Sequence, residues 1–299
     1  MEQKSFDELQ ENVTNNVENI PTGYESRLKR MYDYCSELGK KLKEDVLNGK
    51  SGFLPNEHGE IDVKQAYNMK TNEKASGLAQ VMLLHRMGEL GVTDTGAFVT
   101  DVTIDKAINN GIDTSVIKGQ KPILVPFELK NGGGVILNQW YHISQIKNPE
   151  NLKSYLLNEM SQDAERVTEY NKEHHPDWNP KSDPSKKQMD LPNTTLMNLN
   201  ANSTCQYIGQ VLAASQKQIR LRVTPEQVEK FKENLVNELE QLHTNGEIDK
   251  LAVQKLSNNS VKVCNSIVWQ LNKRENPEQI QGNNKTSPNR QRKEPSIER

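Results

Sequence analysis

The sequence predicts an α+β fold, in which a small antiparallel sheet packs with helices and is followed by a mostly helical C-terminal region and a disordered basic tail. Two observations support this class. Long segments carry apolar residues at steps of three and four, which indicates amphipathic helices. Short apolar segments bounded by turn residues indicate strands. The expected strands are Ala97–Val102, Pro122–Phe127 and Val135–Ile143, and the helices against them are Tyr24–Asn48 and Leu78–Leu90.

The first helix is defined by one apolar stripe that ends at Gly49. The stripe consists of Leu28, Met31, Cys35, Leu38, Leu42 and Val46. The second helix, from Leu78 to Leu90, is expected to be buried and to end at Gly91. A third, short helix is expected to begin with Thr103 as its N-cap, because a threonine hydroxyl can accept a hydrogen bond from a first-turn backbone N–H. Gly111 supplies its left-handed C-terminal stop.

The last two strands are predicted to form an antiparallel hairpin. Asn131-Gly132-Gly133-Gly134 lies between them, and glycine readily adopts the positive φ of tight turns. The turn lacks the Lys-Ser/Thr pair and following helix of a phosphate loop. Pro126 has no N–H to donate to a neighbouring strand, so we expect it at a sheet edge or a bulge.

The rest of the chain predicts further helices joined by a polar segment. One helix starts at Asn148-Pro149 and runs to about Asn171, and residues 173–195 are a linker or long loop rich in Pro, Asp, Lys and Asn. Beyond it we expect four helices, at Cys205–Gln218, Pro225–His243, Glu247–Leu256 and Val261–Leu271. The expected organisation is a disordered N-terminus (1–22), an α+β domain (23–172), the linker (173–195), a helical region (196–272) and a disordered tail (273–299).

Composition limits the function classes. The 299 residues have a formal net charge of -2 and a mean hydropathy of -0.83, so any surface for a polyanion has to be local. Cys35, Cys205 and Cys264 are far apart, which argues against a disulfide framework or a zinc ribbon. The first residues are polar and acidic, and no apolar run approaches the roughly 20 residues that span a bilayer. We therefore expect a soluble, cytoplasmic protein with no membrane association.

An ordered series of short motifs runs from Asn68 to Gln145. It resembles the N-terminal, single-stranded-DNA-binding domain of ArdC-type antirestriction proteins, which also occurs in primases of conjugative plasmids. In this family an Asn-x-x-Thr segment precedes a Leu-rich helix, a Thr-x-x-x-Ala-x-x-x-Gly helix, a Lys-Gly-Glu-Lys-like loop and a Tyr-Asn-Val-x-Gln-like strand end. The matching residues are Asn68, Thr71, Gly77, Leu83, Thr103, Ala107, Gly111, Lys118, Gly119, Lys121, Tyr141 and Gln145.

This sequence also departs from the family pattern. Ala75-Ser76 replaces an aromatic and a basic residue, Gln120 replaces the acid of the loop, and the Pro-Trp segment at the start is missing. The resemblance covers about a quarter of the chain. It implies a single-stranded-DNA-binding accessory protein of a mobile genetic element such as a plasmid, a conjugative element or a phage.

The candidate nucleic-acid-binding residues lie in three places. In the loop Lys118-Gly119-Gln120-Lys121, two ammonium groups flank a glycine that allows close approach to a phosphate; the alternative is an ordinary loop with solvated lysines. Asn68 and Thr71 can form a turn or contact sugar and phosphate, and Lys70 and Lys74 lie beside them. Tyr141, at a position where the family pattern also has an aromatic, can offer a stacking face to a base.

No catalytic residue, metal ligand or cofactor is predicted. The metallopeptidase domain that often accompanies the ArdC N-terminal domain carries His-Glu-x-x-His, and this motif is missing here. Two functions remain open. The first is non-catalytic binding of single-stranded DNA or RNA with little sequence preference. The second is a helical adaptor whose C-terminal helices dock a partner protein, without nucleic-acid binding.

Overall fold

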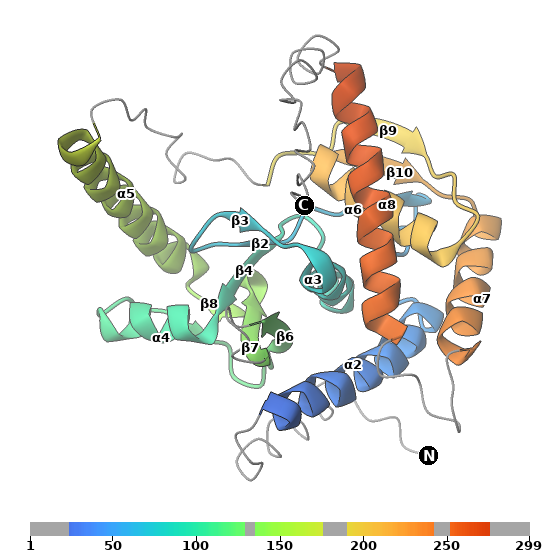
Figure 1. The fold of residues 1–299 in the computed structure, drawn as a ribbon, viewed down its shortest axis with the longest axis horizontal. Coiled ribbons are helices and arrows are strands. Elements are labelled where there is room, and N and C mark those ends of the chain that lie inside the picture. Colours follow the sequence, from blue (N-terminus) through green and yellow to red (C-terminus); the bar gives the residue numbers. More distant parts are fainter. Residues whose placement is uncertain (1–23, 129–134, 176–189, 242–251, 276–299) are drawn as a thin grey trace, which may run out of the picture.

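The computed structural model describes residues 24–128, 135–175, 190–241 and 252–275, and it confirms the α+β class (Figure 1). The predictions for residues 1–22, the glycine turn, most of the linker and the last residues of the tail concern segments outside these ranges. The helices are α2 (Tyr24–Leu47), α3 (Gly77–Glu89), α4 (Asp101–Asn109), the short 3-10 helix η2 (Ile143–Gln145), α5 (Pro149–His174), α6 (Thr204–Lys217), α7 (Pro225–Gln241) and α8 (Ala252–Glu275).

The main sheet has the strand order β3-β2-β4-β7-β6. Its strands are β2 (Tyr67–Asn68), β3 (Glu73–Lys74), β4 (Ala97–Thr100), β6 (Ile123–Glu128) and β7 (Val135–His142). The three predicted strands pair antiparallel as expected, with β7 between β4 and β6. Pro126 is on β6 at the sheet edge, which confirms its predicted position. The sheet is mixed, because β2 pairs parallel to β4.

A second sheet was not predicted. β9 (Thr195–Asn198) pairs parallel with β10 (Ile219–Arg222), which pairs antiparallel with β1 (Glu60–Ile61). A two-stranded sheet joins β5 (Ser115–Val116) and β8 (Ile146–Lys147). Backbone hydrogen bonds therefore connect β1, which follows α2 in the sequence, with the C-terminal region.

The predicted N-cap of the short third helix is wrong. α4 begins at Asp101 with Thr100 as its N-cap, so Thr103 is a buried first-turn residue whose hydroxyl lies 2.9 Å from that of Thr100. Gly111 has φ +78 after the helix, as expected.

The predicted helices 247–256 and 261–271 are wrong as two separate elements, because α8 runs without a break from Ala252 to Glu275. Ser257 and Ser260, inside the expected break, are buried. A Cβ on Gly209 of α6 would lie 2.8 Å from the Ser260 carbonyl oxygen, so small residues allow α6 and α8 to pack closely. The first residues of the predicted tail, 273–275, belong to this helix.

Helix α3 occupies the centre of the molecule (Figure 1). Eight consecutive residues, Gln80 to Met87, are buried, since α8 and β6 pack against the helix and side chains of α2 contact it. The main core continues from there through α2, one face of the sheet and α6–α8. A second core on the other sheet face is formed with α4 and α5, and contains Val99, Ile104 and Leu156. Among the described helices, none has the length and apolar character needed to cross a bilayer.

We expect Gly88→Ala to destabilise the protein strongly. A Cβ at Gly88 would lie 1.9 Å from the backbone nitrogen of Gly52, and neither backbone can move without repacking α3. Overpacking of a core typically costs about 1–3 kcal/mol, and contact with backbone places this case at or above the upper end. Urea unfolding measures the loss.

Gly119→Ala is the matched control. An added Cβ there meets nothing within 4 Å, so only the positive φ of +86 is strained, at roughly 1 kcal/mol. Equal losses of stability in the two variants would contradict the close α3 contact.

Candidate nucleic-acid interface

The loop that carries Lys118 and Gly119 displays both residues to solvent between β5 and β6. Gly119 has φ +86 with open space around the position of a Cβ, so its backbone is accessible to a ligand. Lys121, at the end of the loop, is half-buried. The loop therefore presents one exposed lysine and one half-buried lysine on either side of accessible backbone.

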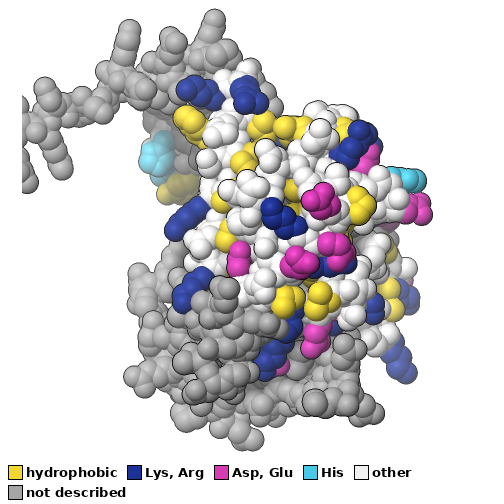
Figure 2. Space-filling model, turned by 90° about the vertical axis from the view of Figure 1, so that its right-hand side faces the viewer, with side chains coloured by type: hydrophobic (Ala, Val, Ile, Leu, Met, Phe, Trp, Pro, Cys, Tyr) yellow, Lys and Arg dark blue, Asp and Glu magenta, His cyan; other side chains and the backbone are white. Residues whose placement is uncertain are grey.

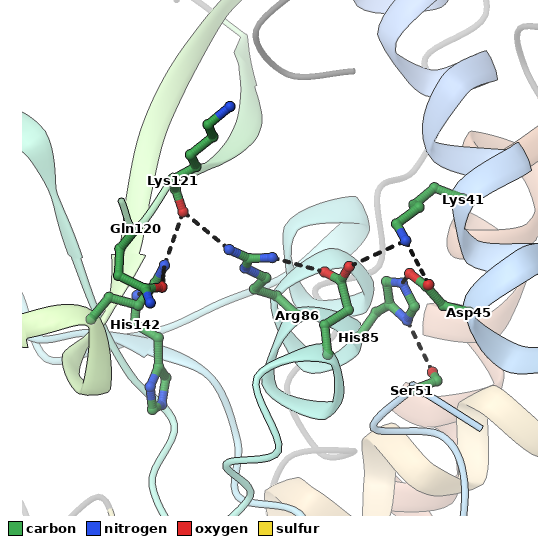
Figure 3. Close-up of polar contacts among 10 residues, drawn as sticks. Lys41, Asp45, Ser51, His85, Arg86, Gln120, Lys121 and His142 are labelled. Atoms are coloured by element: carbon green, nitrogen blue, oxygen red, sulfur yellow. Dashed lines mark hydrogen bonds and ion pairs between the residues drawn. The ribbon is translucent and has the colours of Figure 1, made fainter. Parts of the chain in front are cut away.

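The end of this loop is held by two side chains (Figure 3). The carbonyl oxygen of Lys121 accepts hydrogen bonds from Arg86 Nη2 at 3.0 Å and from Gln145 Nε2 at 2.9 Å. The same Gln145 nitrogen lies 3.1 Å from Gln120 Oε1. A carbonyl with two donors, one of them charged, is firmly positioned.

Backbone hydrogen bonds fix the start of the loop. The N–H of Gln120 donates to the Ile117 carbonyl at 3.0 Å, and the N–H of Ile117 donates to the Gln145 carbonyl at 2.9 Å. Gln145 thus holds the loop at both ends, through its backbone and its side chain. Sequence matching singled out Gln145 as part of a motif, and its role in the structure is to position Lys118–Lys121.

His142 in turn positions Gln145. The N–H of His142 donates to Gln145 Oε1 at 2.9 Å, and the His142 side chain is buried. Its Nδ1 accepts from the Ser144 N–H at 3.2 Å, so Nε2 carries the proton and donates to the Thr95 carbonyl at 3.0 Å. Burial lowers the pKa of His142 below its ordinary value. The neutral ring is therefore the form that the fold accommodates.

Arg86 belongs to a buried polar network between α2 and α3 (Figure 3). Its Nη1 lies 3.2 Å from Glu89 Oε2, and Lys41 Nζ lies 3.9 Å from Glu89 Oε1 and 2.6 Å from Asp45 Oδ1. Burial alone would raise the pKa of Asp45, but hydrogen bonds from His85 and Lys41 outweigh it and leave that pKa below its usual range. Burial raises the pKa of Glu89.

The same network brings Ser51, His85 and Asp45 into contact. Ser51 Oγ lies 3.0 Å from His85 Nδ1, and Asp45 Oδ2 lies 3.2 Å from His85 Nε2. The residue types match a serine hydrolase triad, but the imidazole nitrogens are used the other way round. The three residues are 6%, 1% and 2% exposed, so substrate has no access to the hydroxyl. The contacts hold the loop after α2 against α3.

Asp45, His85 and Glu89 also have ligand atoms within 4.8 Å of one another, as a metal site would. Lys41 already contacts both carboxylates and Arg86 contacts that of Glu89, so their charge is balanced by protein cations. A divalent ion would have to displace a buried ammonium group. These residues are better explained as a buried ion-pair network than as a metal centre.

The second group of predicted residues lies on the β2–β3 hairpin. Asn68 Oδ1 accepts from the Lys70 N–H at 2.8 Å and Thr71 Oγ1 from the Glu73 N–H at 3.4 Å, so both side chains stabilise the turn. Lys70, Thr71 and Lys74 are exposed. This hairpin and the strand that follows the Lys118–Lys121 loop lie on opposite sides of the five-stranded sheet, where three strand spacings, about 14 Å, separate β2 from β6.

Tyr141 lies on the face of β7 that packs against the second core. Its neighbour Trp140 packs against the main core on the opposite face. Burial raises the pKa of Tyr141, and the nearby carboxylates of Asp101 and Asp105 raise it further. Two acidic neighbours disfavour a phosphate chain here, so the ring is a poorer stacking platform than its position in the sequence suggested.

Sequence reasoning missed Arg86 as a functional residue. The signal was present, because His85-Arg86 interrupts an apolar helix whose other central residues are Val81 to Leu84 and Met87. Two adjacent polar residues inside a buried helix require partners. Which partners they contact depends on segments more than thirty residues away.

No family model, curated protein or solved structure matches this chain. The residues themselves and their geometry therefore carry the functional argument.

We expect the stability of the protein to fall as the pH is lowered from about 7.5 to about 5. The unfolded chain takes up a proton on His142 near its ordinary pKa of 6.5, whereas the folded ring resists protonation, so acid favours unfolding. Urea unfolding at both pH values measures the loss. The pKa of Glu89 is raised in the folded protein, so its protonation favours the folded state as the pH falls. The variant His142→Asn, which does not titrate, isolates the histidine, and an unchanged pH dependence in that variant would refute this assignment.

We also expect the purified protein to contain no stoichiometric zinc. Lys41 and Arg86 compensate the buried carboxylates, and a dication beside them would be repelled. Elemental analysis after mild chelation checks this. Retention of one zinc per chain, lost in His85→Ala, would replace the ion-pair network with a metal centre.

Proposed function

We propose that this chain is a non-catalytic accessory protein that binds single-stranded DNA, with the Lys118–Lys121 loop as its main phosphate contact. The observation that carries the proposal is the combination of an exposed Lys118, an accessible Gly119 backbone and a firmly held loop end. In an ordinary surface loop, no buried side chains would hold the backbone beside the lysines in place.

Preorganisation explains why the support matters. Binding costs free energy when a loop must be ordered at the same time, and a loop already held in place avoids that cost. Arg86 and Gln145 hold the carbonyl of Lys121, while the turn bond to Ile117 holds Gln120. The phosphate contacts would then form without a large change in the backbone.

The resemblance of residues 68–145 to ArdC-type N-terminal domains supports the same class of ligand and a mobile genetic element as the source. The net charge of -2 favours local contacts over long-range attraction. We infer modest affinity with little sequence preference, because phosphates carry no sequence information. RNA offers the same phosphates and is the closest competing ligand.

One of the C-terminal helices expected to dock a partner packs its apolar face inside this chain. The apolar stripe of α7 is buried: Val228, Phe231, Leu235 and Leu239 all belong to the main core. On the face shown in Figure 2, described residues of both charges are interspersed and apolar side chains occur in small groups. Trp269 on α8 is 54% exposed, and it remains the best anchor for a protein partner.

Replacing Lys118 and Lys121 together with Glu should abolish binding to a fluorescein-labelled oligo-dT at low salt, because two attractive contacts become repulsive. Fluorescence anisotropy measures the affinity. The wild-type salt dependence should be shallow, since each neutralised phosphate adds only about 0.7 to the slope on single strands. The exposed Lys118 should contribute only roughly 0–1 kcal/mol to stability, and thermal unfolding shows whether replacing the half-buried Lys121 also leaves the fold intact.

Lys230→Glu with Lys262→Glu is the matched control, because both lysines are exposed on α7 and α8 and the change in net charge is the same. This control should retain most of the affinity. Equal loss in both double variants would indicate a general charge effect, and wild-type protein without binding at low salt would favour the adaptor function.

A further inference from the structure

A cavity of about 150 Å³ lies between the β2–β3 hairpin and helix α5. Its lining combines apolar side chains with four residues that carry polar groups. The lining residues are Tyr67, Met69, Asn72, Lys153, Leu156, Leu157, Met160 and Asp190. Ligand sites are typically concave and apolar with few polar groups, and this cavity is smaller than the ~300 Å³ at the lower end of their usual range. It is therefore sized for a single ring system.

The hairpin separates two kinds of side chain. Tyr67, Met69 and Asn72 line the cavity, whereas Lys70 and Thr71, in the same turn, are exposed. The turn thus places an ammonium group and a hydroxyl directly next to apolar walls. This alternation suits a ligand that has both a flat apolar part and a charged part.

Asp190 makes the wall of the cavity rigid. Its Oδ2 accepts from the Tyr67 hydroxyl at 2.9 Å and from the Thr95 hydroxyl at 2.8 Å, and its Oδ1 accepts from the Gly96 N–H at 3.0 Å. These bonds fix the orientation of the tyrosine ring. A fixed aromatic ring loses little conformational freedom when another ring stacks on it.

We propose that this cavity holds one unstacked base of single-stranded DNA, while Lys70 contacts an adjacent phosphate. This inference rests on the proposed function, and it adds a base-binding subsite to the phosphate-binding loop. Tyr67 and the two methionines supply polarisable surfaces for a base, and Asn72 supplies an amide at its edge. Lys153 pairs with Glu150 at 2.8 Å in a solvent-exposed contact, which a phosphate can replace at little cost.

Leu157→Trp tests the subsite. Leu157 lines the cavity but is 48% exposed, so a larger side chain can fill the cavity without entering the core. The probes are oligo-dT and an abasic strand of the same length, which has the phosphates without the bases. Binding of oligo-dT should weaken at least about fivefold, the effect of losing one stacked base, while binding of the abasic strand stays unchanged.

Val167→Trp is the matched control. Val167 is 54% exposed on the same helix, does not line the cavity, and receives the same indole group. It should change the affinity for neither strand. Thermal unfolding of both variants shows whether the fold is retained, and the unaltered affinity of Leu157→Trp for the abasic strand shows it independently.

Methionine methyl groups give a direct reading of the site. In protein labelled at the methionine methyls, the NMR signals of Met69 and Met160 should shift on addition of oligo-dT and stay in place with the abasic strand. Signals assigned to methionines outside the cavity, such as Met82, which is buried in the main core, should not move.

Three outcomes would overturn the inference, and they separate it from the proposed function. Equal wild-type affinity for both strands would remove the base subsite and leave phosphate binding intact. A wild-type preference for oligo-dT that survives Leu157→Trp would place the base elsewhere. Wild-type protein that binds neither strand would end both proposals.

Discussion

The burial of helix α3 on all sides is the constraint on which the rest of the structure depends. Gln80 to Met87 are buried, yet the sequence places His85 and Arg86 among them. A buried donor or acceptor without a partner costs about 1–3 kcal/mol, and more if it is charged. Partners must therefore come from neighbouring segments. Asp45 and Ser51 are hydrogen-bond partners of His85, and the Lys121 carbonyl is a partner of Arg86. Hydrogen bonding to the buried polar side chains of one helix therefore fixes the positions of three other segments.

The same requirement connects the core to the surface. Arg86 is shared between Glu89 inside the network and the Lys121 carbonyl at the end of the exposed loop. Close packing around Gly52 and Gly88 keeps α3 at a fixed distance from the segment after α2, so the guanidinium has little freedom to move. The rigidity of a surface loop, which is a property that binding requires, is in this protein a consequence of satisfying a charge in the interior.

Much of the fold could be predicted from the sequence, because periodicity reports burial. The stripes of α2 and α7 and the strands β4, β6 and β7 were visible in this way. The second sheet was not. β10 alternates buried and exposed residues over only four positions, and its partner β1 lies about 160 residues earlier, so no local signal pairs them. The polar Ser257–Ser260 segment indicated a break, whereas its small side chains in fact allow two helices to approach.

The candidate site could likewise be predicted only in part from the sequence. The exposed Lys118 and the left-handed Gly119 follow from local sequence, but the residues that hold them come from α3 and η2, and the cavity proposed for a base needs α5 beside the β2–β3 hairpin. Three strand spacings, about 14 Å, separate β2 from β6 across the sheet, beyond the ~8 Å over which salt at physiological strength screens charges. Two positive groups at that separation neither repel each other strongly nor reinforce a common field. Their contributions to binding a flexible strand should therefore add independently, and an acidic protein can bind a polyanion by placing a few short-range contacts instead of carrying a basic surface.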